Sequence, residues 1–321
     1  MQPLADTLVV DFTRYLPGAY ASRELRALGA RVVRVEPPGG DPMRLSAPAW
    51  DTALRAGTES VVCDLPTDAV FARELCARAD VVVEGFRPGV ASRLGIGADD
   101  VPATTVYCSI TGFGDDPAHR SRAGHDVNYL GWAGVLADTS PALPPVQIAD
   151  LAAGALGAVT RILAALLERA RTGSGPRIVV SMTHRSHDLV AHRLGGEPVP
   201  RLLTGGLACY RLYETADGGY VTVGALEPKF FARLAELLGR PDLADRQYDE
   251  NQEELAAELA AIFTNRSRDA WLAHFGDEDV CVGPVFTREE AAAALGMSGI
   301  AHDEVPLGAH TDAWRRELGV S

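Results

Sequence analysis

Short apolar runs alternate with helical patterns along the first half of the chain. Each run ends in polar or turn-forming residues and is typical of a buried parallel strand: 7–12, 31–36, 60–65, 80–86, 105–110 and 177–181. The intervening segments carry helical spacing, which ends at Gly29 in one case and covers residues 68–79 in another. Strands that alternate with helices predict βαβ units, and therefore an α/β fold with a Rossmann-like large domain and a mostly parallel sheet.

The pattern changes after residue 196. Two runs at 210–214 and 220–224 flank Ala216-Asp217-Gly218-Gly219, which is a strong hairpin signal. Three helical stretches and one more strand follow, at 228–238, 251–263, 268–274 and 279–285. We therefore predict a large α/β domain over 1–196, a smaller α+β domain over 197–299, and a tail over 300–321 that packs back on the large domain.

Composition narrows the class of protein. Hydrophobic residues make up 47% of the 321 residues, and the net charge of −13 comes without the basic face that nucleic-acid binding needs. Five dispersed cysteines without a CxxC pair favour a reducing cytoplasm over a disulfide framework. No signal-peptide pattern is visible, and Arg161 interrupts the apolar helix 151–167, which we interpret as a core helix. We expect a cytoplasmic protein with neither a nucleic-acid nor a membrane partner.

Two polar motifs lie at the mouths of predicted helices. His125 follows Gly124, and an imidazole with an ordinary pKa near 6.5 suits proton transfer, although a histidine that stabilises its loop is the simpler reading. Asp126 precedes a helix predicted over 127–136, so capping that helix is its expected role, and Tyr129 is a possible supporting residue. Asp150 opens the long helix; a capping role would depress its pKa and favour a base or a nucleophile.

Two further features follow predicted strands. Glu227 stands between Leu226 and Pro228, where a carboxylate either stabilises the helix dipole or orients His125. Gly112 and Gly114 follow the fifth strand, where backbone N–H groups can face a developing oxyanion, although a plain turn is the simpler alternative. The chain has neither a GxGxxG motif nor a Walker loop, so a nucleotide cofactor finds no support.

The motifs together resemble a known family. The chain is similar over nearly its whole length to the family III CoA-transferase superfamily (CaiB/BaiF type). The matching segments are 3–36, Glu84-Gly-Phe-Arg-Pro-Gly89, Thr111-Gly-Phe-Gly114 and the tail near His310-Thr311. Within that superfamily it looks most like the α-methylacyl-CoA racemases, on the motifs 124–129, 149–154 and 224–230.

The resemblance implies an interlaced homodimer, with the active site between the large domain of one subunit and the small domain of the other. It implies an epimerase that moves a proton at the α-carbon of an acyl-CoA thioester through an enolate. His125 (paired with Glu227) and Asp150 would be the two acid/base groups, and neither a metal nor a redox cofactor is required. One alternative is a CoA transferase in which Asp150 attacks a thioester to form a mixed anhydride; another is a non-catalytic homologue.

The chain departs from the family's pattern where CoA phosphates are usually held. Pro37 and Pro38 stand where a basic residue often follows the second strand, and the segment 54–59 replaces a basic stretch before the third strand. Arg34, Arg44 and Arg87 remain as candidate CoA-binding residues. We therefore also hypothesise a pantetheine thioester presented by a carrier protein.

Overall fold

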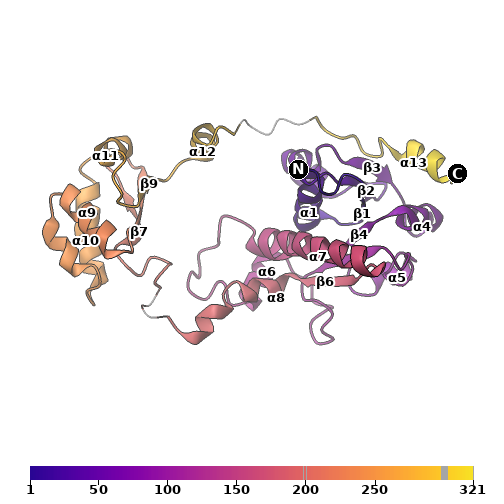
Figure 1. The fold of residues 1–321 in the computed structure, drawn as a ribbon, viewed down its shortest axis with the longest axis horizontal. Helices are drawn as coiled ribbons and strands as arrows, with labels where there is room; N and C mark the ends of the chain where they lie inside the picture. Colours follow the sequence, from indigo (N-terminus) through magenta and orange to yellow (C-terminus); the bar gives the residue numbers. More distant parts are fainter. Residues whose placement is uncertain (198, 200, 298–302, 321) are drawn as a thin grey trace. The chain divides into compact units, whose positions relative to one another are not determined.

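The computed structural model describes residues 1–197, 199, 201–297 and 303–320. The chain forms two compact units, one made of residues 1–192 and 300–321 and the other of residues 193–299 (Figure 1). The sequence placed this boundary at residue 196 and assigned the tail to the large unit.

The large unit is built on a six-stranded parallel sheet in the order β3-β2-β1-β4-β5-β6. The strands are β1 (Leu8–Asp11), β2 (Arg31–Glu36), β3 (Glu59–Val62), β4 (Val81–Glu84), β5 (Val106–Thr111) and β6 (Arg177–Ser181). The strand order reverses between β1 and β4, which defines the switch point of a doubly wound sheet. The predicted α/β class with a Rossmann-like large domain is confirmed.

Helices cover both faces of this sheet (Figure 1). Val9 points into one core with α1 (Tyr15–Ala27) and α7 (Gly157–Thr172), while Val10 points into the other core with α4 (Ala69–Arg78). Successive strand residues face opposite sides, so a sheet covered on both faces reads as a continuous apolar run. This is why the strands were visible in the sequence.

The loop after β2 contains two helices that the hydrophobic pattern did not predict, α2 (Met43–Ser46) and α3 (Pro48–Arg55). Asp51 and Arg55 on α3 are buried at 4% and 1% exposure. The buried side of α3 carries these charged residues while Trp50 is exposed, so the helix departs from the usual rule that apolar residues face the core. The short helices α5 (Val90–Arg93) and α8 (Met182–Asp188) were likewise not predicted.

The long apolar helix predicted from residue 150 begins as a π-helix, η1 (Ala149–Leu156), and continues as α7. Together, residues 149–172 are long and apolar enough to cross a membrane by length and composition, but 44% of the most apolar window is buried inside the protein. η1 packs against α1 and α8, and α7 packs against β5. These contacts are those of a core helix.

The C-terminal tail packs along the free edge of β3. The Trp314 indole of α13 (Thr311–Leu318) donates to Glu59 at 2.7 Å, and its side chain is only 2% exposed. His310 Nδ1 and Thr311 Oγ1 accept the N–H groups of Ser60 and Val62 at 3.1 and 2.9 Å. The tail thus satisfies donors that an exposed edge strand would leave unpaired.

The small unit contains an antiparallel sheet of β7 (Tyr210–Glu214), β8 (Tyr220–Gly224) and β9 (Val282–Pro284). The hairpin of β7 and β8 has the predicted bounds, with Tyr210 opposite Gly224. The helices of this unit are α9 (Pro228–Leu237), α10 (Gln252–Phe263), α11 (Arg268–Phe275) and α12 (Arg288–Ala294), with the 3₁₀ segments η2 (Ala191–Gly195) and η3 (Pro241–Arg246) near them in sequence. Phe231, Phe263 and Trp271 anchor a core of its own.

Candidate active site

A cavity of about 690 Å³ lies at the carboxyl ends of the central strands of the large unit. Its walls come from the segments that follow β1, β4 and β5, together with residues near the start of α6 (Asp126–Trp132) and η1. Ligands of open α/β sheets collect at this edge, at the switch point of the strand order. The cavity therefore lies where the fold is expected to place an active site.

His125 and Asp150 both line this cavity. His125 is the exposed residue that precedes α6, and its backbone N–H donates to Asn128 Oδ1 at 3.0 Å. That bond fixes the backbone at the mouth of the helix. Asp150 is the second residue of η1, near the start of the long helix. The structure thus brings two separated motifs to one cavity.

Asp126 does not play the expected role of capping its own helix. It is the first residue of α6, and its Oδ1 accepts the backbone N–H of Asp150 at 3.0 Å, so its carboxylate lies at the start of η1 instead. Burial raises the pKa of Asp126, while the N–H groups of Asp150 and Ala149 oppose that rise. Contacts between residues far apart in sequence are invisible to local pattern reasoning.

The prediction of a depressed Asp150 pKa is wrong. Burial raises the pKa of Asp150 to about 7, and the negative charge of the neighbouring Asp126 adds to the rise. A carboxyl group in this range is partly protonated at neutral pH and can either give or take a proton.

Tyr129 holds the loop that carries His125. Its hydroxyl donates to the Gly124 carbonyl at 2.5 Å, and the side chain is 8% exposed. A Cβ on Gly112 or Gly124 would approach the Tyr129 ring to 2.5 or 2.8 Å, so both positions need glycine. Burial raises the pKa of Tyr129 to about 12, with smaller contributions from the charges of Asp150 and Asp126. Tyr129 therefore positions the site by packing.

The two glycines after β5 differ in their hydrogen bonding. The Gly114 N–H donates to Thr111 Oγ1 at 2.9 Å, so it is already used. Within the described chain, the Gly112 N–H has no acceptor, and Gly112 lines the cavity. Of the two predicted oxyanion donors, Gly112 fits and Gly114 does not.

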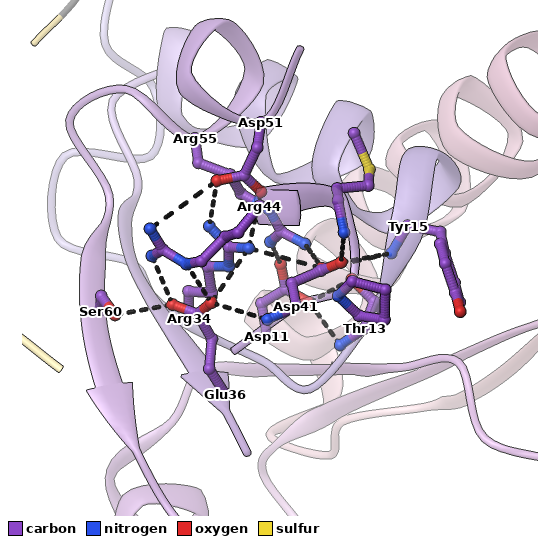
Figure 2. A network of polar contacts seen from close by, with 12 residues as sticks. Asp11, Thr13, Tyr15, Arg34, Glu36, Asp41, Arg44, Asp51, Arg55 and Ser60 are labelled. Carbon is purple, nitrogen blue, oxygen red and sulfur yellow. Dashed lines mark hydrogen bonds and ion pairs between the residues drawn. The ribbon is translucent and has the colours of Figure 1, made fainter. Parts of the chain in front are cut away.

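Arg34 and Arg44 belong to a buried ion network that packs α2 and α3 onto the sheet (Figure 2). The Arg34 side chain is 1% exposed, and its Nη2 bonds Asp51 at 2.7 Å. Arg44 makes two bonds to Glu36, at 2.7 and 2.8 Å. The structure therefore corrects their assignment as CoA contacts, because both guanidinium groups are occupied by internal carboxylates.

Arg87, the third candidate CoA-binding residue, is exposed. It lines the main cavity together with Arg14, which also lines a second cavity of about 310 Å³ beyond β2 and β3. Among the described residues, neither Arg14 nor Arg87 forms an ion pair. Sequence reasoning missed Arg14, although its position in the segment that follows β1 was a usable signal. Both guanidinium groups are available to an anionic ligand.

Glu227 lies in the small unit, directly before α9. Its side chain is exposed and makes neither a hydrogen bond nor an ion pair with any residue that the structure describes. Its pairing with His125 stays a prediction.

The doubly wound sheet, the separate small unit and the cavity with His125 and Asp150 define an α/β protein with a candidate acid/base site at the switch point of its sheet. The chain belongs to CoA-transferase family III, whose sequence profile matches residues 4–299. The α-methylacyl-CoA racemase of Homo sapiens is 34% identical over 303 residues, which cover 88% of this chain and 77% of that protein.

Other relatives carry transferase names. The succinyl-CoA:glutarate CoA-transferase of Mus musculus is 31% identical, over 89% of this chain and 72% of that protein. A probable fatty acyl-CoA transferase of Mycobacterium tuberculosis is 32% identical, over 84% of this chain and 79% of that protein. The crystal structure of a CaiB/BaiF family protein from Brucella suis matches with a TM-score of 0.84 and 28% identity, over 98% of this chain and 99% of that one.

Proposed function

We propose that this protein is an acyl-CoA epimerase of the α-methylacyl-CoA racemase type. The supporting observation is that His125 and Asp150 line one cavity while the pKa of Asp150 is raised to about 7. Inverting a carbon centre by proton transfer needs two acid/base groups, one of which starts protonated. An ordinary aspartate would be ionised at neutral pH, so the raised pKa gives Asp150 its proton.

The reaction uses groups already in the cavity. His125 takes the proton from the α-carbon of the thioester, and the electron pair of that C–H bond moves to the carbonyl oxygen to give an enolate. The N–H of Gly112 suits the developing negative charge on that oxygen. Asp150 then gives its proton to the opposite face of the α-carbon, which inverts the centre. The proposed chemistry needs only acid and base groups, and CoA enters as part of the substrate.

The CoA portion would extend from the main cavity into the second one. Arg14 lines both cavities and Arg87 also lines the main one, so the phosphates would lie where the two cavities share Arg14. This arrangement replaces Arg34 and Arg44 with Arg14 in the predicted CoA site.

A homodimer completes the proposal. In the interlaced arrangement that the family resemblance implies, the small unit of a second copy would bring Glu227 to His125. A carboxylate there would orient the imidazole and favour its protonated form. Light scattering at micromolar concentration would test the dimer, and a monomer with full activity would contradict it.

Deuterium incorporation tests the epimerase directly. The protein is incubated in D₂O with a panel of 2-methylacyl-CoA thioesters and without an acceptor acid, and the mass of the recovered thioester is measured. We expect one deuterium at the α-carbon and loss of optical purity. A thioester that keeps its α-hydrogen across the panel would contradict the proposal.

A CoA transferase is the second candidate, favoured by the transferase names among the relatives. Asp150 would then attack the thioester carbonyl, release CoA as the thiolate and form a mixed anhydride. Hydroxylamine would trap that anhydride and inactivate the protein only when acyl-CoA is present. The raised pKa of Asp150 argues against this role, because the carboxylate is the nucleophile.

The carrier of the thioester is tested by calorimetry with free CoA. Micromolar affinity that is lost with phosphopantetheine alone would favour CoA. Equal, weak binding of both would favour a thioester presented by a carrier protein.

A further inference from the structure

Tyr15 combines an unfavourable backbone with an exposed ring. It is the first residue of α1 and has a φ of 63°, in the left-handed region that residues with side chains rarely occupy. Its side chain is 48% exposed and belongs to no core cluster of the large unit. Its hydroxyl makes no hydrogen bond to any residue that the structure describes. Neither packing nor hydrogen bonding of the ring explains why the strain is kept.

The strain is held by the buried ion network. Asp41 accepts the Tyr15 N–H at 3.2 and 3.4 Å, and Asp41 is itself 1% exposed and paired with Arg55 at 3.2 Å (Figure 2). On the other side of the turn, a Cβ on Gly18 would come within 1.7 Å of the Thr13 hydroxyl, so the close approach of these two segments requires glycine at this position. A conformation fixed this firmly persists only because its surroundings determine it.

The ring that results faces the proposed reaction centre. Figure 2 shows the Tyr15 side chain directed away from the network. Its ring lies 6.4 Å from the His125 imidazole, centroid to centroid, in an edge-on arrangement at 88°. Both residues line the main cavity, together with the exposed Trp50. A carbon that exchanges a proton with His125 would therefore lie on the side of the cavity where the Tyr15 ring is.

We propose that Tyr15 is a specificity-determining residue that limits the size of the acyl group accepted beside His125. The ring occupies space next to the imidazole, so thioesters with a small or narrow group at the α-carbon fit and those with a bulky group are excluded. The proposal rests on the proposed function, since it assigns the acyl group to the side of the cavity where His125 lies.

Three variants test the assignment. Tyr15→Gly removes the ring and suits a positive φ, Tyr15→Ala removes the ring and keeps the strain, and Tyr15→Phe keeps the ring. Each is assayed for α-exchange of a compact substrate, 2-methylbutanoyl-CoA, and a bulky one, 2-phenylpropanoyl-CoA. We expect kcat/KM for the bulky thioester relative to the compact one to rise by roughly tenfold or more in the Gly and Ala variants. Tyr15→Phe is expected to keep the wild-type ratio.

The thermal unfolding midpoints of the variants distinguish the effect of backbone strain on stability from the effect of the ring on selectivity. Tyr15→Gly is expected to melt above Tyr15→Ala, while the two share the same altered selectivity. A wild-type ratio in both ring-less variants would overturn the proposal, and so would a ratio in Tyr15→Phe that shifts as far as in Tyr15→Gly.

Calorimetry with the same two thioesters keeps this test independent of turnover. If the wild-type protein binds them but exchanges neither, the proposed function fails. In that case a gain of affinity for the bulky thioester in Tyr15→Gly would support the proposal for Tyr15, and unchanged affinity would overturn it.

Discussion

The carboxylate of Asp126 accepts the backbone N–H of Asp150 at 3.0 Å, across 24 residues of sequence. The same contact brings a second negative charge close to the Asp150 carboxyl group, which adds to the effect of burial on its pKa. Asp126 therefore both fixes the start of η1 and favours the protonated form of Asp150.

Replacing Asp126 by Asn should change how the reaction depends on pH. The amide keeps the size of the side chain and an oxygen acceptor for the Asp150 N–H, but it removes the negative charge. Without that charge the ionised form of Asp150 is less disfavoured, so its pKa falls. We expect the limb of the kcat/KM profile that reports Asp150 to move to lower pH, with a loss of activity of roughly tenfold near neutrality. Two unmoved limbs would show that Asp126 does not act on Asp150.

Asp150→Asn should stabilise the large unit as the pH rises. The folded-state pKa of about 7 lies above the ordinary value of 3.8, so folding favours the protonated form. The wild-type protein therefore loses stability as the pH rises from 3.8 to 7, and the amide variant does not. We expect the variant to be more stable at pH 8 by about 2–4 kcal/mol, with little difference at pH 4. Urea denaturation at both pH values measures this. Asp99→Asn is the control, because Asp99 is exposed in the same unit.

Substitutions of the three predicted catalytic residues should reduce α-exchange to different extents. His125→Ala and Asp150→Ala are expected to abolish α-exchange, a loss of roughly a hundredfold or more, because each removes an acid/base group. Glu227→Gln is expected to reduce the rate of α-exchange less, since the Glu227 carboxylate acts only by orienting His125. Deuterium incorporation followed by mass spectrometry measures all three. Undiminished exchange in the Asp150 variant would refute the two-base assignment.

Removing Arg55 should lower the free energy of unfolding far more than removing an arginine from a surface ion pair. It is 1% exposed and pairs with Asp11 at 2.5 Å and with Asp41 at 3.2 Å. Arg55→Ala leaves two buried carboxylates without this partner, so we expect a loss of about 3–5 kcal/mol in urea denaturation of the large unit. Arg23→Ala, which removes a partly exposed pair with Glu24 in the same unit, should lose no more than about 1 kcal/mol. Similar losses for both variants would contradict the role of the network.

Gly124→Ala tests the packing that carries His125. The added Cβ would lie 2.8 Å from the Tyr129 ring, so the ring or the loop must move. We expect a loss of about 1–3 kcal/mol in stability and at least roughly tenfold in α-exchange. Gly131→Ala is the matched control, since a Cβ there meets no atom within 4 Å and alanine favours the helix. An equal effect of both substitutions would argue against the loop as a positioning element.

Local patterns in the sequence were enough for much of the fold. The six parallel strands were visible because both faces of the sheet are buried, and the β7–β8 hairpin was visible because its turn requires glycine. The motifs around His125 and Asp150 were found because each stands beside a predicted helix start. All these signals arise from neighbours within a few residues.

The tertiary structure decided what those residues experience. Whether Asp150 holds a proton depends on burial and on Asp126, which no spacing rule relates to it. Arg34 appeared available to phosphate until the fold placed Asp51 against it, and the same inward-facing charges concealed α3. No sequence pattern indicated a role for Tyr15, because its place beside His125 depends on the strained turn that the fold imposes. Charge, burial and facing geometry are set by groups far apart in the chain, so they emerge only when the chain has folded.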